Sequence, residues 1–492
     1  MTIVFKGHDY GYEVRNVALL FFQGEPIIEA PEVPEQGDYI FTELIQSNEK
    51  AKLLLAVRLG GVVTTDRSEV TLSCEAFDKE CERVYGVMMY RMLSPLTGVV
   101  PRWGILTGIR PVTLVHKLTA VGMPEDEIAR HFEQNYLVSP QKTALLLRTA
   151  RKEGSIIATS AVNSFSLYIS IPFCPTRCHY CSFVSHSIEK SAGLIGAYLP
   201  KLCEEISHTG AIARDLGLQL ETVYIGGGTP TTLSAEELKT LFAAVRAAFD
   251  LTTVREYTVE AGRPDTITED KLIAIKESEA TRISINPQTF SDEVLAAIGR
   301  RHTARQTVDS LNLARRIGID CINMDLIAGL PADTLEGFRV SVDTCIALSP
   351  ENITVHTLSL KRSSNLAYEK AAQFSAREGT VTAMTDYAET VLQAAGFNPY
   401  YLYRQRNTRE NLENIGFAKE GCEGLYNVFI MDETHTILAC GAGGVSKLKQ
   451  PGGTRIHRIF NYKYPHEYIA GFDEILLRKG QVKEFYGGCV LR

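Results

Sequence analysis

Residues 166–181 read SLYISIPFCPTRCHYC and join an apolar, β-branched segment to a group of three cysteines. The apolar half is predicted to form a strand, so the cysteines follow on a loop just past the strand end. Cys174, Cys178 and Cys181 have C-x3-C-x2-C spacing, and the next cysteine along the chain is Cys203. Because the other cysteines are scattered, this group indicates a metal site rather than a disulfide framework.

Three interpretations of the cysteine group are open from the residues alone. A structural zinc ion needs four ligands, and His179 or His186 could supply the fourth. The cysteines could instead be buried structural thiols. A [4Fe–4S] cluster is normally held by four thiolates, so three would leave one iron open to another ligand. Because the cluster explains why three thiols gather on one loop, we expect a small molecule to take the fourth iron.

The middle of the chain alternates apolar strand segments with amphipathic helical segments. The predicted strands, each followed by a predicted helix, are 166–173, 221–228, 256–262, 281–288, 321–331 and 352–360. The second of these helices covers 234–249, with Ser234 as its N-cap. Six β-then-α units predict an α/β fold with a parallel sheet, and the pattern allows either a doubly wound sheet or a barrel.

The remaining sequence divides the chain into three expected domains. Residues 1–160 are expected to form an N-terminal accessory α+β domain, in which 49–59 (EKAKLLLAVRL) and 125–136 are predicted helices. Residues 161–398 are expected to form the core, with the boundary near the small, polar segment ATSAVNSF. Residues 399–492 are expected to form a C-terminal extension, and covering the substrate is a possible role for it.

Composition and charge exclude several classes of protein. The chain has 492 residues and a net charge of −7, which argues against a nucleic-acid-binding protein. The N-terminal residues lack a basic region followed by an apolar run, and no apolar run is long enough to span a membrane. Scattered, unpaired cysteines favour the reducing cytoplasm.

The glycine run Gly226–Gly228 ends the second predicted strand and precedes Thr229. Glycines let backbone groups approach a ligand closely without a steric penalty. The same run also suits a tight turn from strand to helix. By itself, the run therefore identifies no ligand.

CPTRCHYC after the first strand and YIGGGTPT after the second together resemble the signature segments of the radical SAM superfamily. This resemblance implies that Cys174, Cys178 and Cys181 hold a [4Fe–4S] cluster. It also implies that S-adenosylmethionine chelates the fourth iron, and that an electron from the cluster cleaves it to a 5′-deoxyadenosyl radical. The glycine run would then receive the methionine amino group.

A narrower resemblance covers roughly residues 165–360. The segments YISIPFC, GGGTPT, VEAGRPD, INPQTF, GRRHT and MDLIAGLP are similar to oxygen-independent coproporphyrinogen III oxidases (dehydrogenases). PRWGILTGIRPVTLV in the first domain and NPYYLYRQRNTRENLENIGFAKEG and GAGGVSK in the tail resemble the HemZ-type branch of this family. An incomplete (β/α)6 TIM-type radical SAM barrel is the fold that the family resemblance implies.

The resemblance implies further cofactor contacts. Tyr168 would lie near the sulfonium, and the residues placed against S-adenosylmethionine are Gly226, Gly227, Gly228, Thr229, Glu260, Gln288, Arg300 and Asp325. The last four come at or just after predicted strand ends, where active sites of (β/α) barrels are built. A carboxylate suits ribose hydroxyls and an arginine suits a carboxylate. Structural alternatives are a solvated helix end for Arg300 and a turn cap for Asp325.

The implied activity is oxidative decarboxylation of two propionates of coproporphyrinogen III to vinyl groups, a step of porphyrin and haem biosynthesis that gives protoporphyrinogen IX. The implied partners are this small tetrapyrrole and an electron donor such as flavodoxin or ferredoxin, with no nucleic acid and no membrane. Basic residues should meet the propionates. The candidates are Lys361, Arg362, Arg404 and Arg406.

Two positions depart from the family pattern, and two alternative functions follow. Phe183 replaces a further cysteine of the classical enzymes, and Ser170 replaces a histidine. Both leave the cluster ligands intact but put the classical activity in question. One alternative is a haem-binding chaperone on the same scaffold, with His302, His356 or Tyr401 as axial ligand. The other is a radical SAM enzyme acting on RNA, which the acidic charge disfavours.

Overall fold

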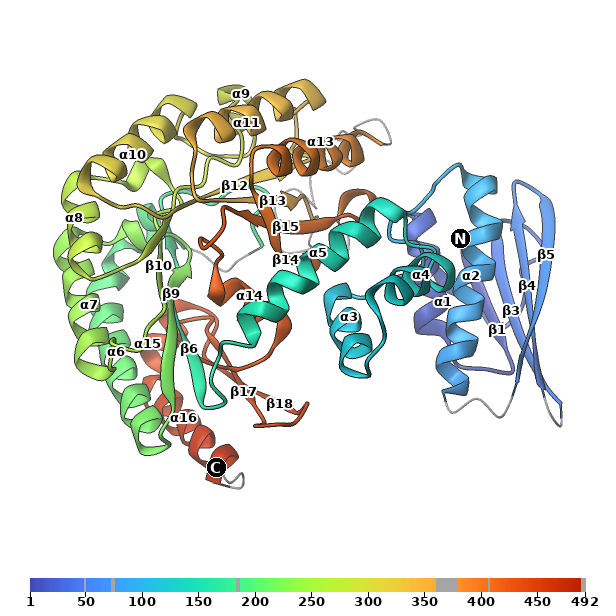
Figure 1. Ribbon diagram of the computed structural model, residues 1–492, viewed down its shortest axis with the longest axis horizontal. Helices are drawn as coiled ribbons and strands as arrows, with labels where there is room; N and C mark the ends of the chain where they lie inside the picture. The colour runs from blue at the N-terminus through green and yellow to red at the C-terminus, as the bar shows by residue number, and fades with distance from the viewer. Residues whose placement is uncertain (48–49, 72–75, 183–185, 360–378, 406–407, 488–492) are drawn as a thin grey trace. The chain divides into compact units, whose positions relative to one another are not determined.

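The computed structural model describes residues 1–47, 50–71, 76–182, 186–359, 379–405 and 408–487, and it divides into two compact units (Figure 1). The first unit comprises Met1–Arg148 and Arg404–Leu412, and the second comprises Thr149–Tyr403 and Glu413–Arg492. The division falls inside helix α5 (Pro140–Ile157), and the predicted boundary near residue 160 lies just past the end of this helix. The small, polar segment that suggested the later boundary connects α5 to the first barrel strand within the second unit.

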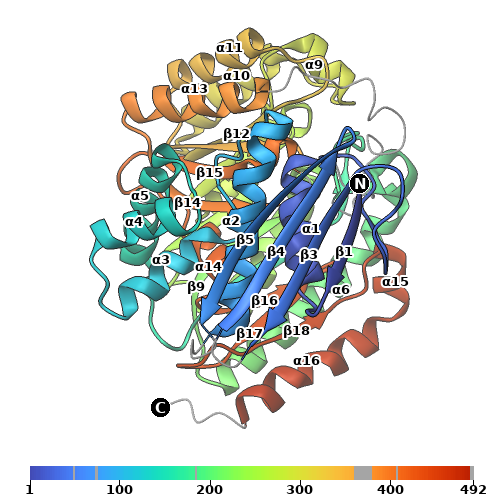
Figure 2. The ribbon, with the colours of Figure 1, turned by 90° about the vertical axis from the view of Figure 1, so that its right-hand side faces the viewer.

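The first unit is built on a five-stranded sheet in the order β2-β1-β3-β4-β5. The strands are β1 (Thr2–Lys6), β2 (Ile28–Glu29), β3 (Tyr39–Gln46), β4 (Lys50–Leu59) and β5 (Val62–Thr71). Helices α1 (Gly11–Phe21) and α2 (Phe77–Thr97) share one apolar core with the sheet, and Figure 2 shows them behind it. Two shorter helices follow, α3 (Pro111–Ala120) and α4 (Glu125–Asn135). The 3-10 helix η3 (Arg409–Asn411) lies in Arg404–Leu412, the later segment of the chain that belongs to this unit.

The helix predicted for 49–59 is wrong, because this segment is strand β4. Its leucines, alanines and lysines have high helix propensity. Ala51, Leu53, Leu55 and Val57 are nevertheless buried at period two, and β4 pairs antiparallel with both β3 and β5. Tertiary packing has overridden the local preference. The helix predicted for 125–136 is confirmed as α4.

The second unit contains an incomplete (β/α)6 barrel, as predicted. Its six parallel strands, adjacent in this order, are β6 (Ser164–Ile171), β9 (Gln219–Gly227), β10 (Glu256–Glu260), β11 (Arg282–Ser284), β12 (Ile322–Ala328) and β13 (Asn352–Thr357). All six predicted strand positions are confirmed. Their side chains are almost entirely buried, as expected for a parallel sheet covered by helices.

Helices follow these strands and lie on the outer side of the sheet (Figure 1). They are α6 (Ile188–Asp215), α7 (Ala235–Ala248), α8 (Glu269–Glu277), α9 (Asp292–Ala297), α10 (Ala304–Ile317), α11 (Leu335–Leu348) and α13 (Thr380–Ala394). Ser234 begins α7 with a capping box to Glu237, so the predicted N-cap is confirmed. Short elements at the strand ends are β7 (Phe173–Cys174), β8 (His186–Ser187), η1 (Pro230–Thr232) and η2 (Pro264–Thr266).

The C-terminal region adds strands to both edges of the barrel sheet. β16 (Thr436–Cys440) pairs parallel with β6, and β15 (Glu413–Ala418) pairs antiparallel with β13. The other strands of this region are β14 (Asn398–Arg404), β17 (Val445–Lys449) and β18 (Ile456–Phe460), and its helices are α14 (Leu425–Asp432), α15 (Pro465–Ala470) and α16 (Phe472–Gly487). The sheet therefore has eleven strands in the described residues.

Throughout the described parts of the chain, no helix combines the length and the apolar character that crossing a bilayer requires.

Candidate functional site

The three cysteines lie directly after the first barrel strand. Cys174 belongs to β7, Cys178 is buried, Cys181 is partly buried, and all three are free of disulfides. Thr229, just past β9, donates its hydroxyl to the Cys174 thiol over 3.5 Å. The structure thus brings the predicted cluster ligands to the same edge of the sheet as the glycine run.

Backbone contacts hold the cysteine loop against the segment that follows α9. The amide of His179 donates to the Ile298 carbonyl over 3.0 Å, and the hydroxyl of Thr176 donates to the Gly299 carbonyl over 3.0 Å. The His179 ring contacts the Ala297 carbonyl through Nδ1, and His186 packs against other aromatic rings. These contacts give both histidines structural roles and lend no support to the zinc alternative.

The glycine run brings two strand ends into close contact. The amides of Gly228 and Thr229 donate to the carbonyls of Ile171 and Phe173 over 2.8 and 2.7 Å. A Cβ on Gly228 would lie 2.5 Å from the Phe173 carbonyl oxygen, so no side chain fits there. The turn interpretation of the run is therefore a feature of the structure, and its contact with a cofactor stays a prediction.

Glu260 ends β10 and lies over the glycine run. The hydroxyl of Tyr224 donates to its carboxylate over 2.5 Å, and a Cβ on Gly226 would lie 3.0 Å from its carboxyl carbon. Burial raises the pKa of Glu260 to about 7; the Tyr224 hydrogen bond opposes this shift and the Asp325 charge adds to it. A hydrogen bond from a neutral donor stabilises the charged form of this buried carboxylate.

Three tyrosines stack beside this carboxylate. The Tyr168 ring lies 6.3 Å from Tyr224 and 6.2 Å from Tyr426, with interplanar angles of 21° and 13°. Tyr224 and Tyr426 are 4.5 Å apart. Burial raises the pKa of the Tyr168 hydroxyl, so this group stays neutral. Tyr426 comes from α14, far along the chain, and nothing in the sequence connected it with this site.

Gln288, four residues past the end of β11, lies beside the middle of β12, which carries Asp325. The Gln288 amide donates to the Asp325 carbonyl over 2.9 Å, and Gln288 has a positive φ of 67°. Burial would raise the pKa of the Asp325 carboxyl, but hydrogen bonds from His356 and Asn323 outweigh it and lower this pKa. Asp325 lies within a strand and does not cap a turn.

Two buried acceptors at this site lack a hydrogen-bond partner among the described residues. They are the side-chain oxygens of Gln288 and Asn286. A buried polar atom without a partner is costly, and a ligand that donates a hydrogen bond would satisfy it. Together with three thiols on one loop that form no disulfide, these acceptors fit a thiolate-held cluster and a ligand carrying amino or hydroxyl groups.

Arg300 is buried rather than solvated, so the helix-end alternative is wrong. Its guanidinium donates to the carbonyls of Asn286 and Gly262 over 2.6 and 3.3 Å, and to the Tyr180 hydroxyl over 3.2 Å. Burial alone would lower the pKa of Arg300, but Tyr180 and Cys178 raise it overall. The fixed positive charge therefore lies close to the cysteine loop.

Other candidates are divided between buried positions and residues that the structure does not describe. Lys361, Arg362 and Arg406, like Phe183, lie outside the described residues. Arg404 is buried in the first unit, where it donates to the carbonyls of Leu106 and Asn411 and covers Trp103. A guanidinium held in this way has a structural role, and its contact with a propionate stays a prediction.

The three residues considered as haem ligands are buried or partly buried, and neither ring nitrogen of His302 has a hydrogen-bond partner among the described residues. His302 is fully buried, and burial together with Arg300 and Arg263 lowers its pKa to about 3. His356 lies 3.7 Å from the Asp325 carboxylate. Tyr401 stacks on Tyr403 and is buried.

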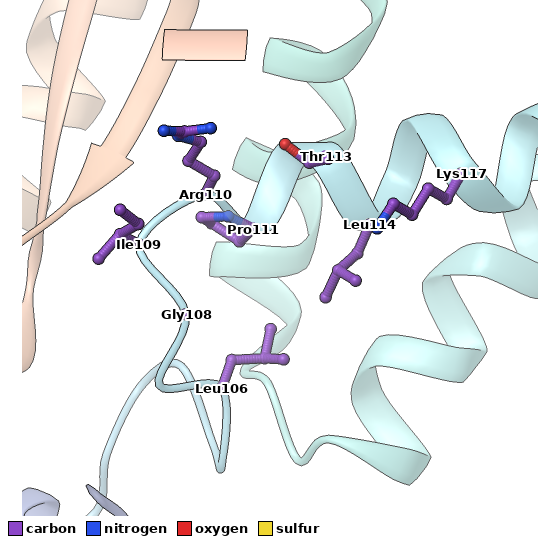
Figure 3. Close-up of a pocket in the computed structure, with 8 residues that line it drawn as sticks. All are labelled: Leu106, Gly108, Ile109, Arg110, Pro111, Thr113, Leu114 and Lys117. Carbon is purple, nitrogen blue, oxygen red and sulfur yellow. The ribbon is translucent and has the colours of Figure 1, made fainter. Parts of the chain in front are cut away.

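A cavity of about 410 Å³ lies in the first unit (Figure 3). Leu106, Ile109, Pro111 and Leu114 give it a largely apolar lining, and Lys117 lies at its side. None of the predicted cofactor contacts lines it.

Comparisons with known proteins agree with this geometry. The model of the radical SAM superfamily matches residues 168–345. The oxygen-independent coproporphyrinogen-III oxidase-like protein HemZ of Bacillus subtilis is 37% identical over 467 residues, which cover 94% of this chain and 93% of that protein. The heme chaperone HemW of the same organism is 33% identical over 62% of this chain and 76% of its own length.

A solved structure supports the fold. Coproporphyrinogen III oxidase (HemN) from Escherichia coli, described as a radical SAM enzyme, has a TM-score of 0.50 and 22% identity over 65% of this chain and 71% of its own. The chain belongs to the radical SAM superfamily and, within it, to the family of oxygen-independent coproporphyrinogen-III oxidase-like proteins. Its cofactors are those of the superfamily, a [4Fe–4S] cluster and S-adenosylmethionine, as predicted.

Proposed function

We propose that this protein is a cytoplasmic radical SAM oxidoreductase of porphyrin biosynthesis, which converts two propionates of coproporphyrinogen III into vinyl groups and yields protoporphyrinogen IX. The observation that carries the proposal is the similarity to a coproporphyrinogen-III oxidase-like protein over 94% of the chain. The similarity to the Bacillus subtilis heme chaperone covers 62%.

In this proposal Cys174, Cys178 and Cys181 hold the cluster. When bound, the cluster and S-adenosylmethionine supply an electron and a carbon radical able to remove hydrogen from a substrate carbon. Gly226, Gly227, Gly228 and Thr229 line the cofactor. The position of the three thiols on one loop just past β6 and the backbone contacts of that loop support this assignment.

The other predicted cofactor contacts differ in the chemical groups that they can bind. Glu260 and Gln288 accept hydrogen bonds from hydroxyl or amino groups through their side-chain oxygens, and the Gln288 oxygen has no partner among the described residues. Arg300 supplies positive charge for a carboxylate. Asp325 keeps its negative charge beside His356. Tyr168 stacks with its neighbours and closes the site with an apolar surface.

Each cleavage of S-adenosylmethionine would take one electron, so a donor such as flavodoxin or ferredoxin belongs to the proposal. The substrate radical would lose one electron as CO₂ leaves, so the proposal also includes an electron acceptor. The substrate is a small molecule, and neither nucleic acid nor membrane takes part. Residues 399–492 are proposed to help cover it, because α14 contributes Tyr426 to the tyrosine stack.

A second candidate function is haem delivery by a chaperone. Relatives from Bacillus subtilis and Escherichia coli named heme chaperone HemW are 33% and 30% identical over 62% of this chain. Ser170 and Phe183 also depart from the pattern of the classical oxidases.

Anaerobic incubation of the reconstituted protein with coproporphyrinogen III, S-adenosylmethionine and a reductant separates the two functions. The oxidase proposal predicts vinyl-bearing tetrapyrroles by chromatography, with 5′-deoxyadenosine formed in step with CO₂. Stoichiometric haem binding without any decarboxylated tetrapyrrole would contradict the oxidase and favour the chaperone.

A further inference from the structure

Arg263 is a buried arginine that links the end of β10 to the cysteine loop. Its side chain is 3% exposed. The guanidinium donates to the Thr176 hydroxyl over 3.0 Å and to the Thr176 carbonyl over 3.3 Å. Two further bonds of 3.1 Å join it to the Asp265 carboxylate in a bidentate pair. The guanidinium is therefore fixed from both sides.

The same guanidinium also contacts a predicted cluster ligand. Nη1 of Arg263 donates to the sulfur of Cys178 over 3.6 Å, a distance suited to hydrogen bonds that sulfur accepts. Cys178 is itself buried, so solvent weakens this interaction little. Hydrogen bonds to the sulfurs and net charge around a cluster are among the factors that set its reduction potential.

We propose that Arg263 tunes the reduction potential of the cluster: its N–H bond and buried charge at Cys178 stabilise the reduced state and make it accessible to the electron donor. This inference rests on the proposed function, because Cys178 must be a cluster ligand. One electron enters the cluster from the external donor, and no bond is made or broken. A nearby cation favours the more negative of the two states, so Arg263 makes the potential more positive.

Asp265 sets the strength of this effect. Its carboxylate pairs with Arg263, and it is 17% exposed against 3% for the arginine. The carboxylate holds the guanidinium in place but also offsets part of its charge. Removal of the two charges should therefore move the potential in opposite directions. Disorder of the cysteine loop alone would not shift the reduction potential in opposite directions in the two variants.

The test is a redox titration of the anaerobically reconstituted full chain, followed by electron paramagnetic resonance without S-adenosylmethionine. Iron per chain is measured on the same samples. Arg263→Gln is expected to make the midpoint potential more negative, and Asp265→Asn to make it more positive. Thr176→Val is a neutral control, because it loosens the same loop contact without a change of charge. Arg305→Gln removes an exposed charge from α10 and controls for net charge.

The outcomes separate the possible failures. Opposite shifts in the two charge variants, with both controls near the wild-type potential, support the proposal. No shift in Arg263→Gln, or the same shift in Thr176→Val, overturns it while the cluster site stands. If Arg263→Gln loses its iron, Asp265→Asn decides, and a potential that is unchanged or more negative overturns the proposal. Wild-type protein without iron would instead refute the cluster assignment.

Discussion

Replacement of Gly228 by alanine tests the close approach between β9 and the cysteine loop. The new methyl group would lie 2.5 Å from the Phe173 carbonyl oxygen and 2.8 Å from that of Ile171. Both obstacles are backbone atoms, which cannot rotate away as a flexible side chain could. The strand ends must therefore separate, and the loop that begins at Cys174 must move with them.

The cost can be worked from the contacts that would be lost. Separation breaks the hydrogen bonds from the amides of Gly228 and Thr229 to the two carbonyls. Each is worth about 0.5–1.5 kcal/mol, and forcing an extra carbon into a packed interior costs about 1–3 kcal/mol. The free energy of unfolding of the second unit should fall by about 2–6 kcal/mol. Iron retention should fall as well, because Cys174 is displaced.

Denaturant unfolding and iron content, measured on the same preparations, check this prediction. Gly193→Ala is a matched control, since a Cβ at this exposed position of α6 meets nothing within 4 Å. Alanine there should stabilise the helix by about 0.5–1 kcal/mol. If Gly228→Ala unfolds at the wild-type denaturant concentration and keeps its iron, the two strand ends do not approach as described.

Three further predictions concern the buried charges. Glu260→Ala or Arg300→Ala should weaken S-adenosylmethionine binding by about 1.5–3 kcal/mol, because hydrogen bonds to charged groups are lost. Calorimetry measures the binding, and the iron content should stay unchanged. Normal binding would refute these contacts. The pKa of Glu260 is about 7 against an ordinary 4.5, so between these pH values the native state holds a proton that the unfolded chain releases. The free energy of unfolding of the cofactor-free protein should therefore fall as the pH rises from 4.5 to about 7. Glu260→Gln should remove that part of the slope in denaturant titrations, and an unaltered slope would contradict the assignment. Lys479→Met should lower the free energy of unfolding by about 3–5 kcal/mol, because it leaves the buried Glu205 carboxylate without the ammonium group that lies 3.0 Å away. A loss below about 1 kcal/mol would mean that the ion pair is hydrated.

The barrel strands were predictable because each is a short apolar run bounded by turn residues. Ser234 was predictable because its pairing with Glu237 is local. The strand β4 was missed because a helix-favouring composition hid its period-two burial pattern, which became decisive once β3 and β5 packed beside it.

The site was only partly predictable for a related reason. Cys174, Cys178 and Cys181 could be found because their spacing is local. Tyr426 and Arg263 could not, because their roles depend on segments that meet only in the fold. The signal for Arg263 was its place beside Asp265 just after a strand end, which a sequence alone does not distinguish from a surface ion pair.

The central claim is that three cysteines, and no fourth, hold a cluster with one open iron. Iron and acid-labile sulfide per chain, counted after anaerobic reconstitution of wild type, Cys178→Ala and Cys203→Ala, test it most directly. Cys203 lies in α6, where burial raises the pKa of its thiol and disfavours the thiolate that binds metal. The account predicts about four irons in wild type and in Cys203→Ala, with most of the iron lost from Cys178→Ala. Loss of the cluster from Cys203→Ala, or zinc in place of iron in wild type, would contradict it.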